Sequence, residues 1–298
     1  MAAVDTTQVT TAYVKQYGDT LHLSVQQRGS RVRPTIMIQQ PINGEFAFID
    51  RIGSTEAQIS TTRFGDSPLI HTPYIRRRVG MQNAEWGELI DSQDKLRMLI
   101  DPTSQLMLNA TFALGRQVDG ILFDAMYGTA YGGKDGAVAV TFPAGQQVAV
   151  NFGASSNTGL TVEKLREARR ILRKNEVDPM VDGSLYIIVT ATQLDNMLAT
   201  TEVTSADFNS VKALVNGEIN TFMGFNWVHS ELVPVDGTSY RRVPAYASSA
   251  IGMGIGMEPQ SALAPRPDKK FIPYAFYTQA FGAVRLEEEK IVEIKCAE

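Results

Sequence analysis

The chain has 298 residues, of which 44% are hydrophobic and 20% charged, a composition typical of folded globular proteins and not of disordered or fibrous ones. Its 28 basic and 32 acidic side chains leave a net charge of −4, whereas proteins that bind nucleic acid through phosphates usually carry a basic excess. Cys296 is the single cysteine and excludes an internal disulfide. Because no signal peptide and no membrane-spanning apolar run is visible, we expect a soluble protein of a reducing compartment.

The first part of the chain predicts an extended, polar structure. Residues 1–33 are dominated by Thr, Gln and Arg and predict an irregular N-terminal arm. From Thr35 to about Gln82 the signals are those of strands and turns, because "TIMI" is followed by the turn cluster "QQPINGE" and then by "FAFI". This stretch has no helical periodicity.

Three adjacent arginines stand near the end of this stretch, in "HTPYIRRRV". Side chains alternate along a strand, so Arg76 and Arg78 are expected on one face and Arg77 on the other. Such a strand cannot be buried in its own domain unless each guanidinium has a partner. The sequence thus raises the question of where these partners lie.

The clearest predicted helix spans residues 101–127. Asp101 is a suitable N-cap, Pro102 fits the first helical position, and apolar residues then recur at three- and four-residue steps up to Gly128. A shorter helical segment is predicted before it, in "AEWGELIDSQDKLRMLI". A second amphipathic helix is predicted from Thr161, in "TVEKLREARRILRKNEVD".

The remaining elements alternate irregularly. Strands and turns are predicted over about 128–158, a strand in "SLYIIVT", a short helix in "ATQLDNMLAT", and a helix followed by a strand in "VKALVNGEINTFMGFNWVHSELVP". The C-terminal stretch is strand-like, with Val292, Ile294 and Cys296 on one face. Because there is no regular βαβ alternation, the predicted fold class is α+β.

Two glycine-rich stretches resemble nucleotide-binding loops but lack the required context. "GTAYGGKD", 128–135, has an aspartate where a phosphate loop needs a hydroxyl, and it follows a helix instead of a strand. A turn that ends the helix is the better interpretation. "GMGIGMEP", 252–259, lacks the third-glycine spacing and the following helix of a dinucleotide-binding fingerprint, so we favour close packing of a strand.

The sequence shows no group of catalytic residues or metal ligands. His22, His71 and His229 lie in unrelated segments without metal-ligand spacing, and no cysteine pair is present. No G-x-S-x-G elbow occurs. The basic residues of the second helix, from Lys164 to Lys174, are interleaved with glutamates, so a solvated helix face is favoured over a nucleic-acid contact. We predict neither a catalytic site nor a cofactor.

Four stretches together resemble the major capsid proteins of tailed bacteriophages, which share the Hong Kong 97-type fold. They are "YGDTLHLSVQQRGSRVRP", "HTPYIRRRVGMQNAEWGELIDSQDKLRMLIDPTSQ", "GLTVEKLREARRILRKNEVD" and "FGAVRLEEEKIVEIKC". "TEVTSADFNSVKALVNGEINTFMGFNWV" also looks like the middle region of that family. The resemblance covers most of the chain, and these stretches are diagnostic as a set although none is a catalytic motif.

The resemblance implies a division of the chain. It consists of an N-terminal arm (1–33), an extended loop that overlaps the neighbouring subunit (34–82), a peripheral domain (83–154) with its spine helix (101–127), an axial domain (155–240) and a return to the peripheral strands (241–298). The partners of the polar loop are then expected on an adjacent copy. The candidate intersubunit contacts are Arg63, Asp66, Arg76, Arg77 and Arg78.

The implied function is a major capsid protein that self-assembles into hexamers and pentamers of an icosahedral head enclosing double-stranded DNA. Assembly is expected in the cytoplasm of the bacterial host, with scaffolding and portal proteins as partners, and a decoration protein is left open. The short arm leaves little room for a fused scaffolding region, so a separate scaffolding protein is expected. A mildly acidic subunit predicts only weak, non-specific contact with DNA. No membrane partner is expected.

Two other interpretations remain open from the sequence. The first is an encapsulin-like shell of the same fold, used as a cellular nanocompartment with enzyme cargo. The second belongs to another class, a hydrolase or nucleotide-binding enzyme built on the glycine-rich stretches. Loss of a nucleotidase activity in a Lys134→Ala variant would favour that enzyme.

Overall fold

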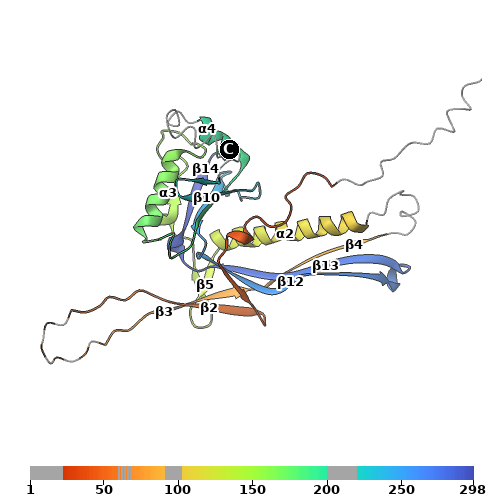
Figure 1. Cartoon of the computed structure of the whole chain (residues 1–298), viewed down its shortest axis with the longest axis horizontal. Helices are drawn as coiled ribbons and strands as arrows, with labels where there is room; N and C mark the ends of the chain where they lie inside the picture. Colours follow the sequence, from red (N-terminus) through yellow and green to blue (C-terminus); the bar gives the residue numbers. More distant parts are fainter. Residues whose placement is uncertain are drawn as a thin grey trace, which may run out of the picture.

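The structure, a computed structural model, describes residues 23–59, 61, 63, 65, 67, 69–90, 103–199 and 220–298. The described residues form three β-sheets. In Figure 1 a lobe containing α3 and α4 lies above a long layer in which α2 runs along several strands, and a two-stranded hairpin projects away on the other side. The described α-helices are α2 (Thr103–Tyr127), α3 (Val162–Lys174) and α4 (Ala191–Ala199).

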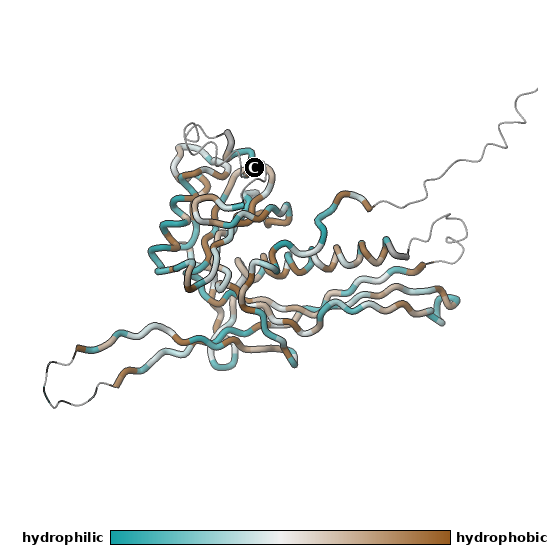
Figure 2. The backbone as a smooth tube through the Cα atoms, in the orientation of Figure 1, coloured by the Kyte–Doolittle hydropathy of each residue, from teal (hydrophilic) through white to brown (hydrophobic). Residues whose placement is uncertain are grey.

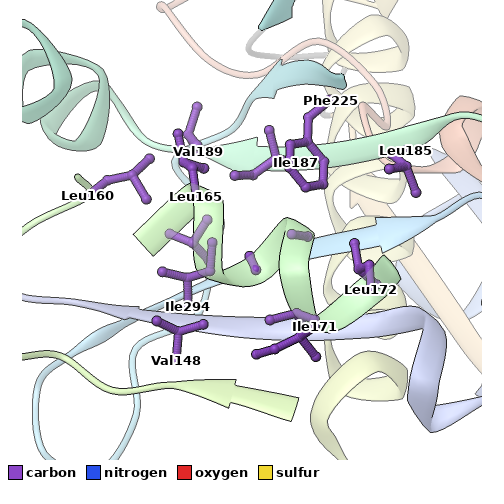
Figure 3. Close-up of a cluster of buried hydrophobic side chains, with 14 of the residues drawn as sticks. Val148, Leu160, Leu165, Ile171, Leu172, Leu185, Ile187, Val189, Phe225 and Ile294 are labelled. Carbon is purple, nitrogen blue, oxygen red and sulfur yellow. The ribbon is translucent and has the colours of Figure 1, made fainter. Parts of the chain in front are cut away.

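A six-stranded sheet of order β7-β14-β11-β8-β10-β9 forms the core of the lobe. Its strands are β7 (Gln147–Val148), β8 (Leu185–Val189), β9 (Thr221–Phe222), β10 (Phe225–His229), β11 (Arg241–Ala247) and β14 (Ile291–Cys296). Ile187 of β8 and Ile294 of β14 pack with Leu165 of α3 in one buried cluster (Figure 3). Val292 and Cys296 belong to the same cluster, which confirms that the three side chains share one face of the last strand.

Helix α3 begins where the sequence predicts it. Thr161 is the N-cap, and its side chain accepts a hydrogen bond from the backbone N–H of Lys164 at 3.3 Å. Glu163 in the first turn and Arg173 and Lys174 in the last turn complement the helix dipole. The apolar stripe faces the sheet, and the hydrophilic face points outward (Figure 2).

A four-stranded sheet of order β1-β12-β13-β4 runs along α2. Its strands are β1 (Ile38–Pro41), β4 (Gln82–Leu89), β12 (Ile251–Arg266) and β13 (Ile272–Arg285). The buried Gln279 amide of β13 donates to the Leu114 carbonyl oxygen of α2 at 2.9 Å, and Leu122 of α2 shares a core with Phe281 of β13. The predicted long helix is confirmed from Thr103 onward, while residues 101 and 102 lie outside the described part.

The third sheet, of order β2-β3-β5-β6, forms the base of the projecting hairpin. Its strands are β2 (Phe46–Ile52), β3 (Tyr74–Gly80), β5 (Ala130–Gly132) and β6 (Val138–Val140). β2 and β3 pair antiparallel along their whole length. Ile49 and Val79 on the inner face pack with Val284 and Leu286. The base of the hairpin is therefore fixed to the body of the molecule, while the connecting residues extend away from it (Figure 1).

The segment predicted as a short helix before α2 is a strand, so that prediction is wrong over β4. β4 pairs with β13 along its full length, and Trp86 packs edge-on against Tyr277 with 6.3 Å between ring centroids. Pairing with a neighbouring strand thus outweighs the local sequence pattern. The strand predicted at "TIMI" begins only at Ile38 and joins β12, not β2. The other predicted helical residues, 91–100 and 211–219, lie outside the described part.

Glycines allow β12 and β13 to pass close to the base of the hairpin. A Cβ atom at Gly254 would lie 2.0 Å from Cδ1 of Ile42, and one at Gly282 would lie 2.2 Å from the carbonyl oxygen of Gly80. Distances this short leave no space for a side chain. The interpretation of "GMGIGMEP" as closely packed strand is confirmed.

Gly282→Ala is expected to lower the free energy of unfolding of the unassembled chain by about 1–3 kcal/mol, because the new methyl group has to displace backbone. The control is Gly145→Ala, since no atom lies within 4 Å of a Cβ at that position. The control is expected to change stability by less than about 0.5 kcal/mol. Chemical denaturation measures both values, and equal losses would contradict the close contact.

Candidate assembly interface

Arg76 and its partner Asp50 lie on the outer face of the hairpin base. They are paired across the two strands, and two hydrogen bonds join the guanidinium to the carboxylate, at 2.6 Å and 2.9 Å. The guanidinium also lies 5.2 Å from the ring centroid of Phe48. The hydrogen bonds from Arg76 lower the pKa of the Asp50 carboxyl. Arg76 therefore already has a carboxylate partner within its own chain.

Arg77 points to the opposite face and is buried, with 4% of its surface exposed. Its guanidinium donates to both carboxylate oxygens of Glu288, at 2.7 Å and 2.9 Å, and to the carbonyl oxygen of Leu286. The family resemblance led us to expect the partner of Arg77 on an adjacent copy. Its partner instead lies within the same chain, because the turn after β13 brings a carboxylate beneath β3.

Arg285 shares the Glu288 carboxylate with Arg77, and these three residues are termed the Glu288 cluster. Arg285 is fully buried. It donates to the carbonyl oxygens of Met126 and Gly128 at the end of α2, at 2.9 Å and 2.8 Å. It donates to a carbonyl oxygen of β6 as well. Burial lowers the pKa of the Arg285 guanidinium. The cluster thus joins α2, β3, β6 and β13 at one point.

Three further ion pairs lie next to the Glu288 cluster. Arg51 of β2 contacts Glu287 at 3.2 Å. Lys290 contacts Asp182 at 2.7 Å and Glu287 at 3.0 Å. The segment that follows β13 therefore connects the hairpin to the lobe as well as to the long helix.

Arg78 returns to the outer face of the hairpin base but differs from its two neighbours. Its guanidinium carbon lies 4.7 Å from the ring centroid of Phe46 and 5.0 Å from that of Tyr131. Among the described residues, no carboxylate forms an ion pair with it and no acceptor a hydrogen bond. Of the other two predicted contacts, Arg63 lies exposed in the connection between β2 and β3, and Asp66 lies outside the described residues.

The connection between β2 and β3 carries uncovered apolar side chains. Among the described residues, the outermost backbone hydrogen bond between its two sides joins Gly53 N–H to the Pro73 carbonyl oxygen at 2.8 Å. Farther out, Ile59 and Leu69 are 92% and 90% exposed, and Figure 2 shows hydrophobic segments on this projection. The described part of the chain does not cover these side chains.

The N-terminal segment is held on α2 by one buried carboxylate. Asp119 is fully buried and accepts hydrogen bonds from the backbone N–H groups of Arg31 and Val32, at 3.0 Å and 3.1 Å. The side chains of Gln27 and Ser30 donate to the same carboxylate. One helical residue thus satisfies four donors and fixes the path of the segment before β1.

The apparent nucleotide-binding and metal-binding features do not form a chemical site in the described residues. Gly128 ends α2, and the residues after it form the β5–β6 hairpin, which confirms the prediction of a helix-ending turn. The structure groups no three metal-ligating side chains among the residues it describes. His229 contacts Arg31 and Glu231. Burial raises the pKa of the Cys296 thiol to about 12, which disfavours a reactive thiolate.

The basic face of α3 is smaller than the sequence indicates. Lys164 is fully buried, and its ammonium group donates to the carbonyl oxygens of Thr158, Gly159 and Lys295 at 2.8–3.0 Å. Burial lowers its pKa. Lys164 therefore ties α3 to β14 instead of joining a solvated surface.

Sequence reasoning missed Asp119, Arg285 and Glu288, which organise the interior. A signal was present, because Asp119 stands within the apolar stripe of a helix, next to Val118 and three residues before Leu122. A charged residue at such a position needs partners when the helix is buried. The sequence does not show which distant residues supply them.

The sequence and the fold were compared with known proteins. The family model described as "Phage capsid protein" matches residues 9–298. A search of curated proteins gave no match. Among solved structures, the capsid of cyanophage P-SCSP1u is similar with a TM-score of 0.73 and 14% identity, over 97% of this chain and 94% of that chain. The capsid of Ralstonia phage GP4 has a TM-score of 0.74 and 12% identity, over 100% and 98%. A structure of Mycobacterium phage Che8 has a TM-score of 0.70 and 12% identity, over 95% and 97%.

The structural similarities show the Hong Kong 97-like α+β fold of phage capsid proteins. The chain belongs to the phage capsid protein family. It is a major capsid protein, a structural component that self-assembles into the capsid of the virion, and not an enzyme. The alternative of a cellular nanocompartment is not favoured. None of the described helices is long and apolar enough to cross a membrane.

Arg77→Ala is expected to lower the free energy of unfolding of the unassembled chain by about 3–5 kcal/mol, because it leaves the Glu288 carboxylate buried with one partner fewer. The control is Arg76→Ala, which removes an exposed pair and is expected to have a much smaller effect. Thermal and chemical unfolding measure the difference. A loss for Arg77→Ala no greater than that of the control would show that the cluster does not anchor the hairpin.

Asp119→Ala is expected to release the N-terminal segment from α2 while the rest of the chain stays folded. The backbone N–H groups of Arg31 and Val32 lose their acceptor, so their hydrogen exchange should become at least about tenfold faster. Asp124→Ala, on an exposed part of the same helix, is the control. Hydrogen-exchange mass spectrometry measures the exchange rate of this segment. Unchanged protection would rule out that Asp119 anchors the segment to α2.

Proposed function

We propose that this chain forms the hexamers and pentamers of an icosahedral phage head that encloses a double-stranded DNA genome. The observation that carries the proposal is the projecting hairpin, which exposes Ile59 and Leu69 beyond its last described backbone pair. Apolar side chains on an extended segment are stabilised by burial against another molecule. In a shell of identical subunits, that molecule is the adjacent copy.

The proposed division of the chain follows the family resemblance. Residues 1–33 act as the arm, 34–82 as the extended loop and 155–240 as the axial domain. Residues 83–154 and 241–298 together make the peripheral domain. The arrangement in Figure 1 supports this division, because the lobe, the helical layer and the hairpin are separate parts of the shape.

Three of the five predicted contacts are retained as intersubunit contacts: Arg63, Asp66 and Arg78. Arg76 and Arg77 already have carboxylate partners in their own chain. In the proposal Arg77 anchors the hairpin base, which an adjacent copy then contacts, whereas the exposed pair of Arg76 with Asp50 contributes little.

The proposed partners beyond other copies of the chain are a separate scaffolding protein and a portal protein, with a decoration protein as an optional addition. Assembly takes place in the cytoplasm of the bacterial host. Contact with packaged DNA is weak and non-specific, because the net charge of −4 repels phosphates. A container that has to release its genome benefits from such weak contact.

The test compares the full chain with two variants of the connection between β2 and β3. One variant replaces residues 54–72 by a two-residue Asn-Gly turn, and the other replaces them by a Gly/Ser segment of equal length. Negative-stain electron microscopy and light scattering detect shells. The full chain is expected to form closed shells, while both variants keep the unfolding temperature of the full chain and form none, because neither can bury apolar side chains on a neighbour.

Shells formed by the Gly/Ser variant at the concentration needed by the full chain would contradict the role of the loop side chains. Shells formed by the full chain expressed alone would contradict the need for a separate scaffolding protein. A full chain that stays monomeric, with or without a scaffolding protein, would overturn the proposal itself.

A further inference from the structure

A small cleft lies beside Arg78, between the hairpin base and the end of α2. Its volume is about 260 Å³, and residues of β3, α2, β5 and β13 line it. Ile121 and Val284 form an apolar floor, whereas Arg78 and Asp124 supply opposite charges. The aromatic ring of Tyr131 stands at its side. The cleft is thus apolar at its floor and charged at its margin.

Arg78 is held in position but is not neutralised. Its guanidinium carbon lies over the rings of Phe46 and Tyr131, and cation–π contacts of this kind restrict a long side chain without using its N–H donors. Among the described residues neither Arg78 nor Asp124 forms an ion pair, although they line the same cleft.

The two neighbouring arginines, unlike Arg78, both have carboxylate partners. Arg76 has a carboxylate partner on the next strand and Arg77 has one beneath the strand. The three residues are consecutive, so a general shortage of carboxylates near β3 does not explain the free donors of Arg78. A guanidinium that is oriented by two rings and finds no acceptor among the described residues is prepared for bidentate binding of an anionic group.

We propose that Arg78 binds a carboxylate side chain of a second copy of this chain, and that the cleft beside it receives the apolar stem of that side chain. This inference rests on the proposed function. Phe46 and Tyr131 are 43% and 41% exposed around Arg78, and arginine with aromatic side chains is the composition that dominates binding energy at protein interfaces.

The charges around the cleft select a protein partner over DNA. Asp124 in the cleft repels any anion, but it opposes a DNA backbone, which carries a charge on every nucleotide, more strongly than it opposes a single carboxylate. A second copy supplies carboxylates in excess, because the chain has 32 acidic and 28 basic side chains. A protein side chain can also fill the apolar floor, which a phosphate group cannot.

The test substitutes Arg78 in the full chain by Gln, which removes the charge and keeps a polar side chain of similar length. The matched control is Arg76→Gln, because Arg76 lies on the same face and on an aromatic ring but has its acceptor in the chain. The critical concentration for assembly is measured by light scattering, and the unfolding temperature is measured on unassembled protein. Where the chain alone forms only hexamers or pentamers, the same comparison uses their dissociation into single chains.

Arg78→Gln is expected to raise the critical concentration about ten- to a hundredfold, the range that corresponds to loss of one charge-assisted contact. Its unfolding temperature is expected to stay that of the wild type, because no hydrogen bond or ion pair within the described chain is lost. Arg78→Lys is expected to fall between the two, since an ammonium group lacks the planar pair of donors. Arg76→Gln is expected to assemble within about threefold of the wild type.

An unchanged critical concentration for Arg78→Gln, alongside normal wild-type shells, overturns the inference and leaves the proposed function intact. A fall in unfolding temperature large enough to account for poor assembly overturns it too, because Arg78 then acts within its own chain. Shells that form normally but contain less DNA would assign Arg78 to the genome and not to a second copy. Wild-type protein that never associates overturns both proposals.

Discussion

The hairpin and the long helix depend on a single buried carboxylate. Glu288 accepts hydrogen bonds from Arg77 on β3 and from Arg285. Arg285 also donates to carbonyl oxygens at the C-terminal end of α2. Two buried cations on one anion are tolerated because backbone carbonyl oxygens take up the remaining donors of Arg285. The arrangement is costly to break, and it joins segments that lie about 150–210 positions apart in sequence.

The parts of the molecule near the Glu288 cluster are closely packed, whereas the outer part of the hairpin is exposed. Glycines such as Gly254 and Gly282 leave room for strands to cross closely, and Asp119 holds the N-terminal segment on the helix. Beyond Gly53 and Pro73 no described backbone pair continues the hairpin. A subunit of this kind presents a well-defined shape near its centre and leaves the completion of its projecting part to other molecules.

Much of the fold could be predicted from the sequence, because local signals mark it. Thr161 is a recognisable N-cap for α3. Apolar residues at three- and four-residue steps indicate α2, and alternating apolar residues indicate β14. β4 was missed because a strand that gains its backbone partners from β13 needs no local preference. The site was predicted only in part. Strand alternation separated Arg77 from Arg76 and Arg78, but the partners Glu288 and Asp50 are distant in sequence and only the fold brings them near.

The projecting hairpin has a mechanical consequence. A two-stranded ribbon that is fixed at one end and loaded at the other behaves as a cantilever, so a pull at its tip acts as a torque on the fulcrum. In the proposed shell, strain from neighbours or from compressed DNA would reach Arg77 and Glu288 rather than the strands' hydrogen bonds alone. The fulcrum is buried and ionic, so a load that separates Arg77 from Glu288 would leave a buried carboxylate with one partner fewer.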